Sequence, residues 1–215
     1  MKNLLYKEFR LVLHPTTLIF LALSAMLLIP NYPYCVVFFY TCLGVFFTCL
    51  SGRENHDIFY TVSLPIRKRD MVKARFAYVA LIQLAQMVIA VPFALLRAQL
   101  GLGGNAAGLD ANIALFGVAF ILLGVFNYVF FTHYYKAPDK VGGAFNRACI
   151  VFTLLMILAE GSSFAVPFVR SRLDTPDPQF AAEKLTVLAV GLVLYAAFTL
   201  LAYKKSVKSF EGLDL

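Results

Sequence analysis

The chain alternates between six long apolar blocks and short polar or charged connectors. Each block approaches the roughly 20 residues that a helix needs to cross about 30 Å of hydrocarbon. The blocks cover residues 15–29, 36–50, 77–96, 112–132, 149–169 and 185–203. We therefore predict an all-α, polytopic membrane protein with six transmembrane helices. The first block is short, and we expect it to gain length from the apolar residues 11–13.

A compact turn, Pro30-Asn31-Tyr32-Pro33, separates the first two blocks. Two prolines stop helix propagation, and asparagine tolerates turn geometry. The first two predicted spans should therefore form a helical hairpin.

Residues 1–14 have the pattern of an amphipathic helix that lies along the membrane interface. Polar side chains share one helical face and large apolar ones share another: Asn3, Lys7, Arg10 and His14 against Leu5, Phe9 and Val12. A cleaved export signal is disfavoured, because the small residues Ala22–Ala25 lie inside the apolar run and not after it. We expect an interfacial helix over 1–14, followed by a transmembrane domain over 15–215.

Composition and charge agree with a membrane protein and give its orientation. Hydrophobic residues make up 60% of the chain and charged ones 14%, against about 25% charged in ordinary soluble domains. A formal net charge of +7 could suggest nucleic acid binding, but nearly all the basic residues flank apolar blocks. Fifteen of the 19 Lys and Arg fall on the side of the termini, which predicts that both termini are cytoplasmic.

The longest charged connector, residues 51–76, lies on the predicted cytoplasmic side. Asp57 can cap a short helix that carries Phe59 and Tyr60, and Pro65 can end it. Exposed aromatic groups on a cytoplasmic helix indicate a docking surface for another protein. They are equally compatible with anchoring of the loop at the lipid headgroups.

The layout resembles the permease subunits of type 2 ATP-binding-cassette (ABC-2) exporters, in particular the small six-helix permeases that include exporters of amphipathic or antimicrobial peptides. The resemblance rests on three segments: Leu4-Leu5-Tyr6-Lys7-Glu8-Phe9-Arg10 at the start, Glu54 after the second span, and the run from Ser63-Leu64-Pro65-Ile66-Arg67-Lys68-Arg69-Asp70 to Phe76.

The resemblance implies a division of labour between chains. This chain would be a permease that pairs with itself or a related chain in a bacterial cell membrane, and two separate ATPase subunits would bind ATP and magnesium. Residues 1–14 would form the connecting helix, and the loop 51–76 would hold a coupling helix that docks on the ATPase. The implied contact residues are Glu54, Asp57, Ile58, Phe59, Tyr60 and Leu64, flanked by Arg67 and Arg69.

We expect no catalytic or metal site in the chain itself. The glycines of residues 103–108 have phosphate-loop spacing, but Leu109 and Asp110 follow where such a loop needs Lys and Ser or Thr. Ser163 and His133 should lie at opposite membrane depths, which argues against an intramembrane serine protease. His56 has no second ligand at metal-binding spacing.

Glu160 is the only acidic residue well inside an apolar block. An ionised carboxylate at that depth is costly, so it should face the bundle interior or water. One interpretation places Glu160 on a translocation path for a cationic substrate. The other is that residues 160–163 end the helix and that residues 164–169 form a re-entrant segment.

Two other sets of residues are interpreted as packing elements. Cys35, Cys42 and Cys49, with the neighbouring Gly44, form a small-residue seam that lets helices approach closely in lipid. Gln83 and Gln86 are expected to bond to neighbouring helices.

The competing function class is an ATP-independent membrane transporter or a structural membrane subunit. A secondary transporter commonly shows inverted repeats and several intramembrane ionisable residues, and this sequence has neither.

Overall fold

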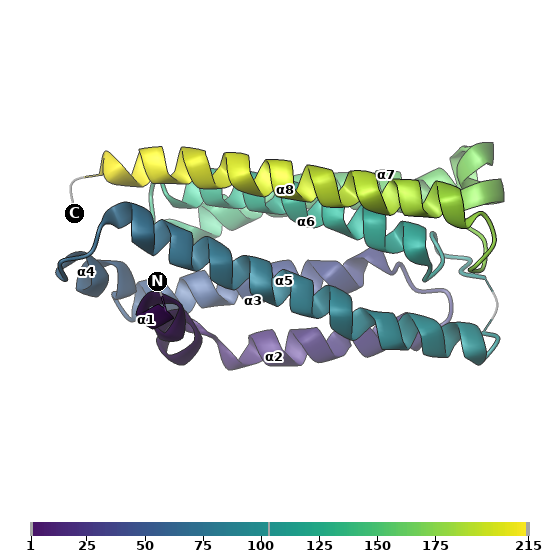
Figure 1. The fold of residues 1–215 in the computed structure, drawn as a ribbon, viewed down its shortest axis with the longest axis horizontal. Coiled ribbons are helices and arrows are strands. Elements are labelled where there is room, and N and C mark those ends of the chain that lie inside the picture. The colour runs from purple at the N-terminus through teal and green to yellow at the C-terminus, as the bar shows by residue number, and fades with distance from the viewer. Residues whose placement is uncertain (1, 103, 214–215) are drawn as a thin grey trace.

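The computed structural model describes residues 2–102 and 104–213, which form helices and no β-strand (Figure 1). The helices are α1 (Lys2–Lys7), α2 (Pro15–Ala22), α3 (Cys35–Glu54), α4 (Asp57–Val62), α5 (Lys68–Gln99), α6 (Ile113–Tyr134), α7 (Val141–Ala165) and α8 (Ala181–Glu211). Short π- or 3-10-helical segments are η1 (Glu8–Val12), η2 (Leu23–Leu28) and η3 (Val169–Leu173). The prediction of an all-α protein is confirmed.

Five helices, α3, α5, α6, α7 and α8, are long and apolar enough to cross a membrane. The first predicted span corresponds to α2 with η2, which the chain enters after a bend of 82° from its N-terminal helical segment. The described residues therefore contain five to six candidate spans, and the prediction of a polytopic membrane protein is confirmed.

The first span does not gain length from residues 11–13. His14 is extended, with φ −79° and ψ 135°, and α2 begins only at Pro15. Proline suits this first helical position because its missing N–H would have no partner there. The ring of His14 accepts a hydrogen bond from the amide of Thr16 and so caps the helix.

The two ends of the bundle differ. The start of α1, helix α4 and the end of α8 lie at one end, which we call the terminal end (Figure 1). The described residues of three connectors, 29–34, 100–102 with 104–112, and 166–180, lie at the other end, which we call the connector end. Helix α5 passes close to α8 at the terminal end and diverges from it toward the connector end (Figure 1).

Helix α6 lies at the centre and packs against α7 and α8. Its contact with α8 is close because glycines face backbone across it. A Cβ atom on Gly191 would lie 2.2 Å from the carbonyl oxygen of Gly117, and one on Gly124 would lie 2.8 Å from Cα of Tyr195. Such glycine contacts let two helix backbones approach in lipid, where packing drives helix association.

Gly44 and Thr48 of α3 pack against α2, whereas the Cys49 thiol on another face of α3 lies 3.6 Å from Arg75 Nη1 of α5. The Thr17 hydroxyl lies 3.3 Å from the carbonyl oxygen of Gly44 and 3.4 Å from the hydroxyl of Thr48. A Cβ atom on Gly44 would approach Thr17 to 3.2 Å. Cys35, Cys42 and Cys49 are buried and unbridged. Close helix packing is therefore confirmed at Gly44, and the three cysteines are buried inside the bundle.

Candidate functional site

Helix α4, six residues long, is the short helix predicted in the connector 51–76, but Asp57 is its first residue and does not cap it. Helix α3 continues to Glu54, and the chain then reverses through His56, whose φ of 50° is in the left-handed region. Histidine tolerates this conformation better than a β-branched residue does. The turn places the side chain of Asp57, the first residue of α4, against the interior of the protein.

Asp57 belongs to a buried group of charges that we call the ion cluster: Lys7, Glu8, Asp57 and Arg75. The Asp57 carboxylate accepts hydrogen bonds from Lys7 Nζ at 2.6 Å and from Arg75 Nη2 at 2.8 Å. Arg75 also pairs with Glu8 through its Nε atom. Two cations therefore face two carboxylates, so the cluster is balanced in charge.

The ion cluster joins three segments that lie far apart in the sequence. Lys7 ends α1, Glu8 begins η1, Asp57 begins α4, and Arg75 lies on α5. Removing one member of a buried ion pair leaves an uncompensated charge and commonly costs about 3–5 kcal/mol. The cluster therefore holds α4 against both the N-terminal segment and α5.

The opposite face of α4 is exposed. The side chains of Phe59 and Tyr60 are 50% and 62% exposed, and Leu64 just beyond the helix is also exposed. Large apolar groups in such a position are typical of a site that a partner or a lipid surface covers.

The predicted contact residues thus divide into two sets. Glu54, Phe59, Tyr60, Leu64, Arg67 and Arg69 lie on the surface. Ile58 is half-buried and packs against the core, and Asp57 is already held by charges of its own chain. The sequence pattern did not separate these sets, because Asp57 is held by Lys7, 50 positions before it, and by Arg75, 18 positions after it on another helix.

A cavity of about 130 Å³ adjoins α4. Gly52, Ile58 and Phe59 line it from one side. Tyr134 at the end of α6 and Pro138 in the following connector line it from the other. A space of this size beside exposed aromatic side chains can receive a single side chain of a binding partner.

At the connector end, Glu160 is buried and both its carboxylate oxygens accept backbone hydrogen bonds. One oxygen accepts the amide of Cys35 at 2.9 Å and the other accepts the amide of Leu109 at 2.8 Å. Cys35 is the first residue of α3, whose unpaired amides favour a carboxylate. Glu160 therefore caps α3 and ties α7 to Leu109 in the connector before α6.

The contact between Glu160 and the Leu109 amide requires a glycine at position 108. A Cβ atom there would lie 2.0 Å from the Glu160 carboxylate, and the φ of Gly108 is 155°. One interpretation expected α7 to end at residues 160–163. The helix instead continues to Ala165. The chain then turns through η3, so the break lies after Ala165.

The connectors at this end are rich in turns and are also fixed to one another. The side-chain oxygen Oδ1 of Asp174 accepts the amide of Asp110 at 2.8 Å, and Asn112 donates to the carbonyl oxygens of Leu173 and Thr175. Burial raises the pKa of the Asp174 carboxyl, against the opposing effect of the bond from the Asp110 amide. The described residues of these connectors are therefore joined by hydrogen bonds into a cap over the bundle.

A cluster of hydrogen-bonded polar side chains lies inside the bundle. Gln83 of α5 and Asn127 of α6 exchange two hydrogen bonds of 2.9 Å, and Tyr195 and Thr199 of α8 complete the group. Gln86 donates to Ser24 of η2. The expectation that both glutamines bond to neighbouring helices is confirmed, whereas their partners on α6 and α8 had no recognisable spacing in the sequence.

Comparison with known proteins gives the family. The model of the ABC-2 family transporter protein matches residues 3–211, nearly the whole chain. The chain belongs to this ABC-2 transporter family. No curated protein and no solved structure gave a significant match. As an ABC-2 protein, the chain is a membrane transport component, and proteins of this family typically work with an ATPase partner.

Proposed function

We propose that this ABC-2 protein is the permease subunit of an ATP-driven exporter and that α4 is the helix on which its ATPase docks. The observation that carries the proposal is the two-sided environment of α4. Its Asp57 side is held by the ion cluster, while Phe59 and Tyr60 are exposed on the other side. A helix that is held by ion pairs on one face and exposes aromatic side chains on the other can bind a partner and move with it.

The coupling follows from the contacts of the ion cluster. ATP and magnesium bind to the partner ATPase, and the closing ATPase subunits displace α4. Because Asp57 is bonded to Arg75 and to Lys7, movement of α4 pulls on α5 and on α1 together. Helix α5 runs from this cluster to the connector end, so it can carry the displacement across the membrane.

In the proposed assembly, two permease copies, identical or related, form the translocation path and bind two ATPase subunits in a bacterial cell membrane. The terminal end is cytoplasmic, in agreement with the basic residues gathered there. Amphipathic or antimicrobial peptides are the proposed cargo, on the basis of the resemblance to peptide-exporting permeases. Glu160 takes part indirectly, by holding the connector end of the path in shape.

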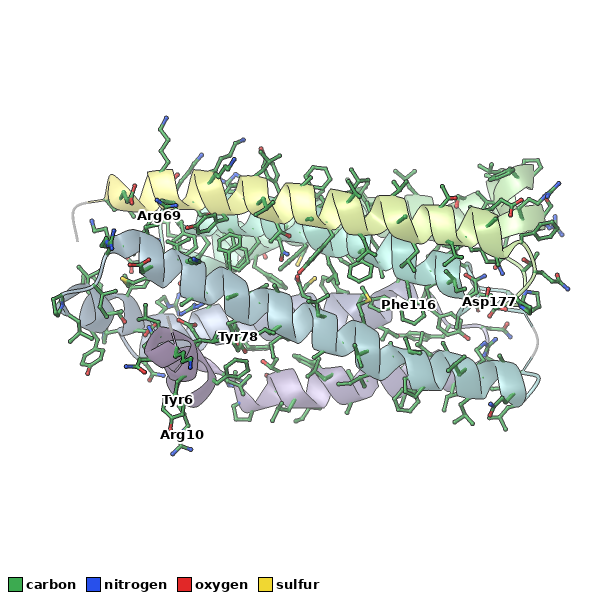
Figure 2. All side chains as sticks on the ribbon, in the orientation of Figure 1. Tyr6, Arg10, Arg69, Tyr78, Phe116 and Asp177 are labelled. Carbon is green, nitrogen blue, oxygen red and sulfur yellow. The ribbon has the colours of Figure 1, made fainter. Side chains whose placement is uncertain are left out.

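The test is copurification of the ATPase with the full chain after Phe59→Ala and Tyr60→Ala. Buried aromatic anchors of an interface commonly contribute about 2 kcal/mol or more each, so either substitution should weaken the complex by about 30-fold or more. Tyr6→Ala is the matched control, because Tyr6 is an equally exposed aromatic residue that points away from the bundle on α1 (Figure 2). An undiminished complex in both α4 variants would contradict docking at α4 and leave the ATP-independent alternative.

A further inference from the structure

A large cavity lies in the connector-end half of the bundle, away from α4. It has a volume of about 600 Å³ and lies between α5, α6 and the beginning of α8, below the ordered connectors. Volumes of roughly 300–1,000 Å³ are usual for sites that bind small ligands. The cavity lies where α5 diverges from α8 (Figure 1).

The walls of this cavity are apolar and elongated. The lining on α5 extends from Met87 to Ala98, about 16 Å along the helix axis. Phe116 and Phe120 of α6 form the facing wall, and Figure 2 shows Phe116 between α5 and α6. A long apolar space parallel to the helices fits a hydrocarbon chain better than it fits a compact polar molecule.

The cavity can be reached sideways from the membrane. Val88 and Leu95 line it from α5, and their side chains are 70% and 59% exposed on the outside of the bundle. In a bilayer these residues face lipid, because α5 is a candidate membrane span. With the termini in the cytoplasm, this half of the bundle lies in the outer leaflet.

The mouth of the cavity carries charges of both signs. Arg97 and Asp110 line it as a pair with Nε and Oδ1 3.2 Å apart, and the Arg97 guanidinium also lies over the ring of Tyr34. Asp177 lines the other side and is held by Lys184, which is fully buried. The side chains of Asp110 and Asp177 remain 15% and 33% exposed. Figure 2 shows Asp177 at the connector end.

From these features we infer that the cavity binds one acyl chain of an outer-leaflet aminophospholipid, with its zwitterionic headgroup at the charged mouth. The apolar walls take the chain, the ammonium group donates hydrogen bonds to Asp110 and Asp177, and the phosphate faces the Arg97 guanidinium. A primary ammonium group has three N–H donors for the carboxylates, whereas a choline headgroup has none. The site should therefore prefer an ethanolamine headgroup to choline.

The inference is tested on the full chain, purified in detergent, stripped of lipid and then incubated with phosphatidylethanolamine or phosphatidylcholine of identical chains. Native mass spectrometry counts the lipid molecules that remain bound. We expect one retained phosphatidylethanolamine per chain and about tenfold weaker retention of phosphatidylcholine, a difference of about 1.4 kcal/mol. Equal retention of both lipids, or of neither, would overturn the inference.

Cavity-filling variants give the second arm of the test. Ala94 lines the cavity from α5, and Ala94→Phe or Val91→Phe should reduce retention by about tenfold or more, because the added ring occupies the space of the chain. Leu84→Phe is the control, since Leu84 is an exposed residue of α5 outside the cavity. Circular dichroism confirms the helix content of each variant. Unchanged retention in a folded cavity-filling variant would overturn the site. This binding requires no ATPase, so its failure would leave the proposed docking on α4 unaffected.

Discussion

The Arg75 guanidinium on α5 donates a hydrogen bond of 2.8 Å to the Asp57 carboxylate at the start of α4. The two residues are 18 positions apart, and both side chains are almost completely buried. This bond and the bond from Lys7 attach a six-residue helix to the membrane bundle. A helix so short would be marginal in isolation, so these contacts determine that α4 persists.

Arg75→Met should destabilise the protein by about 3–5 kcal/mol, because Glu8 and Asp57 then lose a buried cation that compensates their charges. Unfolding in a titration with SDS, followed by circular dichroism, measures the loss. Arg69→Met is the control on the same helix, where an exposed side chain should change stability by no more than about 0.5 kcal/mol. Equal stability of the two variants would contradict a structural role for the ion cluster.

Glu160→Gln should destabilise the connector end by about 1–3 kcal/mol. The –NH₂ group that replaces one carboxylate oxygen cannot accept a hydrogen bond, so one of the two backbone N–H groups loses its partner. Hydrogen exchange of the Cys35 and Leu109 amides should accelerate while exchange in α4 stays unchanged. Glu183→Gln, a surface change at the same end, serves as the control. If Glu160 instead senses a cationic cargo, Glu160→Gln would abolish transport without changing amide exchange.

Gly191→Ala should cost about 1–3 kcal/mol, because the added methyl group would meet the backbone of Gly117 at 2.2 Å and force α6 and α8 apart. Gly161→Ala is the matched control, since a Cβ atom there meets nothing within 4 Å. The same SDS titration compares the two. A Gly191→Ala protein as stable as the control would show that α6 and α8 can separate freely.

Gln83 and Asn127 should show a coupling energy of about 0.6–1.7 kcal/mol in a double-mutant cycle of Gln83→Ala and Asn127→Ala, the range typical of hydrogen bonds inside membranes. Their two reciprocal bonds favour the upper part of this range. Pairing Gln83→Ala with Thr48→Ala, whose residue lies outside this polar group, gives the additive control. Additive effects for Gln83 and Asn127 would mean that each residue is satisfied without the other.

Much of the fold could be predicted from hydropathy and charge. The apolar blocks located the helices, since a chain in lipid must satisfy its backbone hydrogen bonds within each helix. The boundaries were less certain: α5 and α8 extend well beyond their apolar blocks into charged sequence. Helix α2 is not lengthened by residues 11–13, because the extended His14 separates them from Pro15.

The candidate site was only partly predictable. The pattern of residues 51–76 located α4 and its exposed Phe59 and Tyr60. It could not show that Asp57 is buried, because that depends on Lys7 and Arg75, which reach it from two other elements. Glu160 was recognised as unusual, but its amide partners at Cys35 and Leu109 are 125 and 51 residues away.

The sequence by itself thus determined the class of the protein and the approximate places of its helices, and it predicted a cytoplasmic side for its basic connectors. These properties follow from the free energy of placing each segment in lipid, which depends on local composition alone. Only the tertiary structure decided which charges neutralise one another, where α6 and α8 touch through Gly117 and Gly191, and where a cavity remains between α5 and α6. Those properties depend on pairs of residues brought together across the bundle, and no single segment contains that information.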